Sequence, residues 1–505
     1  MASNAAVFAG ACLCFAGPGY HAIFNDDLRP CADRRLFCFA FDAFGRPFTD
    51  GRVAQSFAGC YRFVASNQQK RFALLAIGLG TSLPAADSAV NVALPAIAEA
   101  LLSEPSAIRW TVIVYVLTYA CLMMLLGAWG DRQGYWRVFR LGLWTGALAY
   151  GICAMASSYA VLLIGRGLQG FSSALLLSVG PALMVKIIGD DRREQAVAAY
   201  GTLSSAAAAF GPLIGGLMIY MLGWAGAFWF RLPTALLAML CLGLAKYFSR
   251  STETLETNLG LTEGSRHEPA FAKLKGRSSR YPRMDEPSAL QVLARSLRHQ
   301  CSAGLLKGHA LHAWAQSCGF TSMLFVPFLM MNVMHQSAAV VGFVLFAWPA
   351  GMAIGNSLGP RLMGQTGLRD SFRIGLFLLA LGGFAMALIC APLSPQHGLD
   401  PDGMRMAMVV ALLIQGLGLG IVQMIYTHWV LEQSAPSERG VAGAASLTSR
   451  TLGVIVTAWF WPEMIEFLMR QLAWTWSEVL GLLYLLAAIS LLGLLSQMPR
   501  QSLRM

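Results

Sequence analysis

Twelve long apolar stretches are the feature that most constrains the fold of this 505-residue sequence. About 20 apolar residues in a helix cross the hydrocarbon core of a bilayer, where only helices and closed barrels satisfy all their backbone hydrogen bonds. The composition agrees, because 12% of the residues are charged, whereas soluble domains carry about 25%. We therefore predict an all-α polytopic membrane protein. The predicted spans are 72–97, 110–129, 138–156, 160–188, 196–222, 225–248, 308–331, 338–358, 371–391, 404–431, 441–461 and 479–495.

The distribution of basic residues predicts the orientation of these spans. Lysine and arginine in short loops are retained on the cytoplasmic side of a membrane. When the N-terminus is placed inside, most of the 37 lysines and arginines fall in cytoplasmic segments. We therefore predict a protein of the plasma (inner) membrane with both termini in the cytoplasm, and the net charge of +11 does not imply nucleic-acid binding. The exceptions are Arg109, Arg405 and Arg470 in outer loops and Arg166, Arg231 and Arg450 within spans.

A polar segment between the sixth and seventh spans divides the chain into two halves of six spans. It contains no apolar run long enough to cross a membrane, so we predict a cytoplasmic linker. The halves resemble each other weakly: Gly-Tyr-Trp-Arg at 134–137 is echoed by Gly-Leu-Arg at 367–369 on the same side. Six-helix parallel repeats of this kind are a transporter architecture. The predicted regions are an N-terminal extension (1–70), a first half (71–248), a linker (249–304), a second half (305–498) and a cytoplasmic tail (499–505).

The N-terminal extension has no sustained hydrophobic period, and five of the eleven cysteines lie in it. Three interpretations stay open: a loosely ordered cytoplasmic tail, a stretch that is not part of the native protein, or a metal or redox module. No function is assigned to it. The other cysteines lie singly in or near spans, so we predict neither a disulfide framework nor a metal site.

A glycine-rich segment follows the second span: Gly127-Ala-Trp-Gly-Asp131-Arg132-Gln-Gly134-Tyr-Trp-Arg137. Small residues permit a tight loop, and an Asp beside basic residues can form a breakable ion pair. The segment resembles the signature loop of the major facilitator superfamily, although Trp129 replaces a Leu and Tyr135 stands where that family often has an Arg. The resemblance implies a fold of 12 transmembrane helices in two six-helix pseudo-repeats. The alternative reading of Asp131 is a solvated loop acid. The predicted conformational latch comprises Gly127, Asp131, Arg132, Gly134 and Arg137.

Two further motifs follow in the order that this resemblance requires. Arg166-Gly-Leu-Gln169-Gly170 in the fourth span resembles the intramembrane arginine motif that the family uses in proton coupling. Gly211-Pro212-Leu-Ile-Gly215-Gly216 in the fifth span resembles the motif of its antiporters. Glycines at this spacing give a flat helix face, and a proline frees a backbone carbonyl, so the segment can bend and seal. Ordinary packing of small residues is the alternative.

The first span places Asp87 four residues before Asn91, hence on one helix face. The sequence Asn91-Val-Ala-Leu-Pro95 resembles the first-helix signature of the drug:proton antiporters, in particular their 14-helix branch. Because no extra pair of spans is found in the linker, the chain resembles a 12-helix relative with some 14-helix motifs.

Asp87 is the only acid that we place deep in a span, so it is the candidate proton-coupling residue, with Arg166 as its partner. A purely structural ion pair is the alternative. Arg231 and Arg450 also lie in spans, where each must face protein, water or an anionic ligand. They are candidates for the substrate cavity, together with Asn91 and Gln169. The alternatives are helix packing for Arg450 and, for Arg231, snorkelling to the surface.

Three histidines, His309, His312 and His428, are predicted near the cytoplasmic ends of the seventh and tenth spans. Proton relays and metal ligands are conceivable roles, but we favour interfacial residues with satisfied hydrogen bonds.

The energy source narrows the class of protein. No Gly-x4-Gly-Lys-Ser/Thr loop and no hydrolase signature occurs, so we predict neither a nucleotide motor nor an enzyme, and no cofactor. The proton gradient is the remaining driving force. We predict a monomeric, proton-coupled secondary active transporter that exports small amphipathic molecules by alternating access. Two alternatives stay open: a facilitator or importer of an organic anion, and a transport-inactive receptor or scaffold.

Overall fold

The computed structural model describes residues 51–101, 107–189, 192–258, 298–390, 401–434, 439–472 and 474–497. The predictions for residues 1–50, for most of the linker and for the tail at 499–505 lie outside these residues. Every regular element in the described residues is a helix, which confirms the predicted all-α class.

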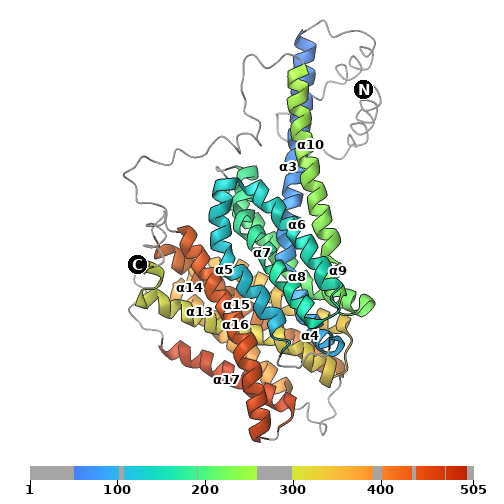
Figure 1. The fold of residues 1–505 in the computed structure, drawn as a ribbon. Coiled ribbons are helices and arrows are strands. Elements are labelled where there is room, and N and C mark those ends of the chain that lie inside the picture. Colours follow the sequence, from blue (N-terminus) through green and yellow to red (C-terminus); the bar gives the residue numbers. More distant parts are fainter. Residues whose placement is uncertain are drawn as a thin grey trace. The chain divides into compact units, whose positions relative to one another are not determined.

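The helices follow one another along the chain from α3 to α17 (Figure 1). Each of the twelve predicted spans falls on one helix or on two helices that a short break separates. The first half contains α3 (Gly51–Ala85), α4 (Ser88–Ala100), α5 (Trp110–Gln133), α6 (Tyr135–Ala154), α7 (Tyr159–Ile188), α8 (Arg193–Leu222), α9 (Gly226–Trp229) and α10 (Arg231–Asn258). The second half contains α13 (Ala303–Phe328), the π-helical turn η5 (Leu329–Val333), α14 (Ala338–Cys390), α15 (Pro401–Glu432), α16 (Arg439–Leu472) and α17 (Trp476–Gln497).

Length and hydropathy test the spans individually. Among the described residues, seven helices are long and apolar enough to cross a membrane, and the bent pair formed by α3 and α4 is an eighth candidate. One of the seven, α14, covers two predicted spans, because its 53 residues are two helices joined across Gly367. The predicted spans on α5, α6 and α13 are helices of 24, 20 and 26 residues.

Two glycines mark equivalent bends in the two halves. Gly134 separates α5 from α6 with φ 91° and ψ 129°, and Gly367 divides α14 with φ 81° and ψ 163°. A positive φ is readily adopted only by glycine. The weak sequence echo between 134–137 and 367–369 therefore reflects the same backbone turn in each half.

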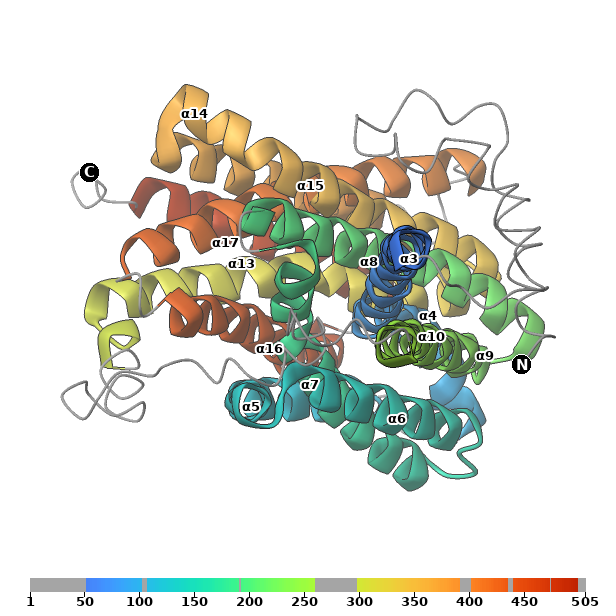
Figure 2. The ribbon, with the colours of Figure 1, turned by 90° about the horizontal axis from the view of Figure 1, so that it is seen from above.

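The α3 residues before Lys70 and the α10 residues from Lys246 onward belong to a compact unit of their own. The larger unit holds the rest of α3 and α10 and the other described helices. Within it, α14, α15 and α17 gather on one side and α5, α6 and α7 on the other (Figure 2). The halves pack through α8 against α14 and through α5 against α16. One buried apolar cluster joins them, with Ile97 and Val112 from the first half and Leu324, Leu345 and Leu483 from the second.

Candidate functional site

The first span is broken near its middle. Pro84 lies in the last turn of α3 and has no backbone N–H to donate. The N–H of Asp87 donates to the Pro84 carbonyl at 3.2 Å, a shortened turn, and α4 continues from Ser88 after a bend of 41°. The break leaves the Asp87 carboxylate and the Ala86 carbonyl available to neighbouring helices.

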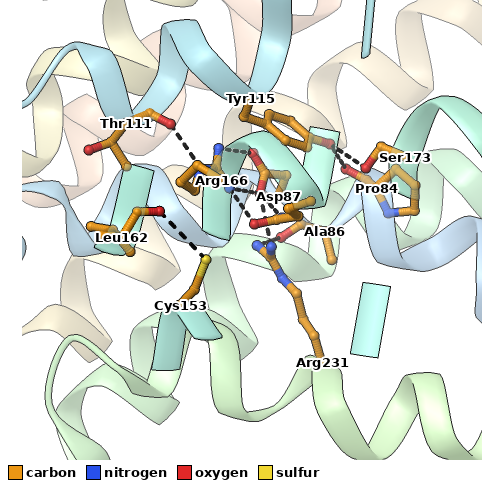
Figure 3. Close-up of polar contacts among 11 residues, drawn as sticks. Pro84, Ala86, Asp87, Thr111, Tyr115, Cys153, Leu162, Arg166, Ser173 and Arg231 are labelled. Atoms are coloured by element: carbon orange, nitrogen blue, oxygen red, sulfur yellow. Dashed lines mark hydrogen bonds and ion pairs between the residues drawn. The ribbon is translucent and has the colours of Figure 1, made fainter. Parts of the chain in front are cut away.

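The Asp87 carboxylate lies at the centre of a buried polar cluster (Figure 3). Arg166 on α7 donates from Nη1 to Oδ1 at 2.7 Å and from Nη2 to Oδ2 at 2.9 Å. Gln169, one turn further along α7, donates to Oδ1 at 2.8 Å, and so does Arg231 at the start of α10. Three predicted site residues thus converge on a fourth. Such two-pronged, charge-assisted pairs are among the strongest hydrogen bonds in proteins.

Arg166 is fully buried, and the other groups around its guanidinium hold it in place. Its Nε donates to the Thr111 carbonyl at 2.8 Å, and Nη1 also donates to the Gln169 side-chain oxygen at 2.8 Å. The Tyr115 ring stacks on it, with Cζ 4.2 Å from the ring centroid. Thr111 and Tyr115 were not identified from the sequence, because neither belongs to a motif and only the packing of α5 on α7 brings them here.

Arg231 is also fully buried, so its predicted alternative role as a snorkelling residue is wrong. Its Nη2 donates to the Ala86 carbonyl at 2.8 Å, while Nε has no hydrogen-bond partner among the described residues. Aromatic rings of Tyr150, Phe228 and Phe230 lie within 6.0 Å of its Cζ. Two arginines against one carboxylate leave the cluster with one uncompensated positive charge.

The glycines of the predicted antiporter motif place α8 between two other helices. A Cβ at Gly211 would lie 2.5 Å from Ser88 Oγ, and one at Gly215 would lie 2.9 Å from Ala89 Cα, both on α4. On the other side, a Cβ at Gly216 would overlap the Ala338 carbonyl oxygen of α14. The motif therefore permits close contact with the broken first span and with the opposite half at once.

The predicted signature loop is mostly helical. The connection predicted between the second and third spans, residues 130–137, is shorter in the structure: α5 continues through Gln133 and α6 begins at Tyr135, so only Gly134 leaves the helix. Gly130 lets Val179 approach, because a Cβ there would lie 2.7 Å from Val179 Cγ1. Arg132 and Arg137 are exposed, Gly127 faces Ser178, and the Asp131 side chain lies outside the described residues. The latch stays a prediction.

A second polar cluster lies in the second half. His312 on α13 is fully buried, pairs through Nδ1 with Ser449 at 2.7 Å and stacks on Tyr426 at 4.0 Å between centroids. Its Nε2 has no partner among the described residues. His309 contacts the Tyr426 hydroxyl, and His428 pairs with Glu432 at 2.9 Å. The expectation of interfacial histidines therefore fits His428 and fails for His312.

Arg450 is next to Ser449 on α16, and the Ser449 hydroxyl pairs with His312. It is partly exposed, and in the part of the chain that the structure describes it has neither a hydrogen bond nor an ion pair. No described contact joins it to Asp87. Of the predicted cavity residues, Gln169 and Arg231 therefore bind Asp87, Asn91 is buried on α4, and Arg450 lies separately.

Direct polar contacts also join the halves. Arg109, just before α5, pairs with Glu463 on α16 at 2.5 Å, and the hydroxyls of Tyr119 and Thr451 on the same helices are 3.1 Å apart. Sequence alone gave no sign of these pairs, since the partners are more than 300 residues apart.

Comparison with known proteins agrees with this architecture. The family model described as Major Facilitator Superfamily matches residues 76–458. The methylenomycin A resistance protein of Bacillus subtilis is 27% identical over 84% of this chain and 92% of its own, and the puromycin resistance protein of Streptomyces alboniger is 25% identical over 72% and 75%. Among solved structures, a D-xylose–proton symporter superposes with a TM-score of 0.58 at 15% identity, over 83% of this chain and 96% of its own. The nucleoside transporter NupG gives 0.59 at 11% identity, over 86% and 100%.

Proposed function

The chain belongs to the major facilitator superfamily, and we propose that it is a proton-coupled exporter of small amphipathic molecules. It is a multi-pass membrane transporter of small-molecule substrates and not an enzyme. Two relatives are named for antibiotic resistance, which supports export. The observation that carries the proposal is the Asp87 carboxylate, held between two arginines at a break in a membrane-spanning helix.

In the proposal, proton binding at Asp87 and loosening of the break between α3 and α4 occur together. The carboxylate accepts four charge-assisted or amide hydrogen bonds, and its negative charge holds two guanidiniums close together. A proton on Asp87 removes that charge and weakens every one of these bonds. The Asp87 side chain keeps 16% of its surface exposed, whereas the two arginine side chains are sealed, so a proton can reach the acid.

The glycine motif of α8 links this event to access. Gly211 packs on Ser88 and Gly215 on Ala89, directly after the break, and Gly216 packs on α14 of the opposite half. A change in the angle between α3 and α4 therefore moves the surface against which α8 seals. We infer that proton uptake opens the α8–α14 contact, and that alternating access follows.

The substrate contacts are proposed for the face between the halves. Arg450 is partly exposed and unpaired among the described residues, and Asn91 lies on α4, which contacts α13. Gln169 and Arg231 act in the proposal as parts of the coupling site. The basic loops support a plasma-membrane protein with both termini inside. The proposal further takes the protein to be a monomer and Asp131 to be its cytoplasmic latch.

The test is proton-driven transport by Asp87→Asn in everted vesicles, screened with a panel of amphipathic compounds that includes puromycin. Asp370→Asn is the matched control, because Asp370 is 61% exposed and, in the described part of the chain, pairs only with Arg373 at the surface. We expect Asp87→Asn to abolish transport under an imposed pH gradient and Asp370→Asn to retain it. Undiminished transport by Asp87→Asn would refute Asp87 as the coupling site.

The guanidinium of Arg450, which has no ion-pair partner among the described residues, favours a second candidate function, a facilitator or importer of an organic anion. An arginine without a counter-charge near the middle of a span is costly unless a ligand supplies one. Proteoliposomes that contain a pH indicator separate the two functions. Export by antiport moves protons against the direction of the substrate, whereas a facilitator moves the anion with no opposite proton flux.

A further inference from the structure

We propose that Arg231 is a movable counter-charge for Asp87, and that a cavity beside it receives the Arg231 guanidinium when Asp87 takes up a proton. This inference rests on the proposed proton coupling at Asp87 and adds a role that is not substrate binding.

The cavity is a partly open pocket between the end of α3, α8 and the start of α10, and the Phe210 and Ile214 side chains in its lining are exposed. Its volume is about 190 Å³, far above the roughly 10–15 Å³ that a single water requires. Arg231 lines it, together with Ser82, Phe210, Phe230 and Thr234. By volume, this space is large enough for the four heavy atoms of a guanidinium.

The chemistry of the lining suits a cation. The Ser82 hydroxyl donates to the Leu79 carbonyl at 2.7 Å, and the Thr234 hydroxyl donates to the Phe230 carbonyl at 3.1 Å. Since both hydroxyl hydrogens are used, the oxygens can only accept further bonds, as an arginine requires. Phe210 and Phe230 add aromatic rings on which a guanidinium can stack. Arg231 itself has no exposed surface to offer an anion.

The occupant is Arg231 rather than a cation from outside. The Asp87 cluster carries one uncompensated positive charge, so a foreign cation beside it would be repelled. Arg231 already contributes to that charge, and moving it adds none. Thr234 lies three residues after Arg231 on α10, hence on the same helix face, within reach of a rotated side chain.

Arg231 is also the arginine that is held less firmly. Without Asp87, Arg166 keeps its bonds to the Thr111 carbonyl and the Gln169 side chain. Arg231 keeps only the bond to the Ala86 carbonyl, and its Nε is unpartnered among the described residues. Once Asp87 is neutral, the two guanidiniums repel each other with no carboxylate between them. Arg231 is therefore the one that moves.

Among the described residues, the two arginines are the only charged neighbours of Asp87. Tyr115 from α5 and Tyr150 and Cys153 from α6 are the other titratable side chains near it, and the described residues place no second acid there. The contacts from α8 are made by Gly211 and Gly215, which do not titrate. In this arrangement, departure of Arg231 is what lets Asp87 hold its proton.

The test fills the cavity without touching the cluster. Ala207 on α8 lines the cavity, whereas its neighbour Ala206 is exposed outside it. We expect Ala207→Phe to lower proton-driven export by roughly tenfold or more, the worth of a lost charged hydrogen bond, and Ala206→Phe to leave it unchanged. Substrate exchange in proteoliposomes, which needs no net proton movement, is expected to survive in both variants. Equal export by the two variants would overturn the inference.

A second pair of variants removes one hydrogen-bond acceptor near the cavity. It keeps the inference testable if Ala207→Phe does not fold. Thr234→Val deletes the hydroxyl of a residue that lines the cavity, and Thr145→Val deletes a hydroxyl on α6 that likewise donates to the carbonyl four residues earlier. We expect only Thr234→Val to slow proton-driven export.

Arg231→Gln is expected to move the half-maximal pH of export upward by about one unit or more, since an adjacent arginine opposes protonation by about that much. An unshifted profile contradicts the inference. If Asp87→Asn still exports, the proposed function fails. If Asp87→Asn is inactive but the cavity variants match their controls, only the movable Arg231 fails.

Discussion

Gly216→Ala tests whether the contact between α8 and α14 controls access. A single methyl group at this position would overlap the Ala338 carbonyl oxygen and lie 2.9 Å from Gly342 Cα and 3.1 Å from Gly342 N. Those three atoms are backbone, so no side chain can rotate away. An ordinary contact needs about half an ångström more at the Gly342 atoms and about one ångström more at the Ala338 oxygen, so the two helices must move apart by up to about one ångström.

The energy of this change can be bounded. Overpacking a close contact typically costs about 1–3 kcal/mol, while replacing glycine by alanine inside a helix gains about 1 kcal/mol. The overpacking cost applies only to the conformation in which α8 and α14 touch. Because the helix gain is the same in both conformations, the overpacking cost of about 1–3 kcal/mol alone shifts the population away from the contact, roughly 5- to 160-fold.

The matched control is Gly201→Ala on the same helix, where a Cβ meets nothing within 4 Å. The assay is alkylation of a single cysteine placed on the α14 face of the contact, followed in both variants together with transport. We expect faster alkylation and weakened transport in Gly216→Ala, with Gly201→Ala unchanged or slightly more stable. Indistinguishable alkylation rates in the two variants would mean that the contact does not control access.

Three further predictions follow from single contacts. Arg166→Lys keeps the charge but loses the two-pronged bond to Asp87, so we expect proton-driven export to fall roughly tenfold or more, measured in everted vesicles. Arg109→Glu breaks the pair with Glu463, whose side chain is 54% exposed, so the expected loss of stability is within about 1 kcal/mol; thermal unfolding should recover when Glu463→Arg is added. Gly134→Ala is expected to cost about 1–2 kcal/mol of unfolding free energy because φ is 91°, whereas Gly364→Ala in an open helical position should cost nothing.

Several features of the fold were predictable because they depend on local sequence. The spans follow from composition alone, since lipid leaves few backbone solutions. Gly134 and Gly367 could be matched between the halves because each residue carries its own backbone preference. Asp87 could be identified because an acid within an apolar span is also a local feature of the sequence.

The pairing inside the site could not be predicted, because it depends on how separate helices pack. Arg231 lies 144 residues from Asp87, and nothing local distinguishes a buried counter-charge from a snorkelling side chain. His312 was misjudged for a similar reason: its distance from the helix end suggested an interface, whereas packing of α15 and α16 buries it. The sequence showed three arginines in spans, and only the structure divides them into two that bind one acid and one that stands apart.

The presence of two arginines at Asp87, rather than one, affects how proton binding is coupled to conformational change. A site with one acid and one arginine would be neutral, and protonating the acid would leave one cation. With two arginines the site is positive before the proton arrives and doubly positive afterwards, if neither arginine moves. Such a charge in low dielectric is costly, so proton uptake must be accompanied by a rearrangement. The second arginine therefore makes conformational change a condition of proton binding, which is what a coupled transporter requires.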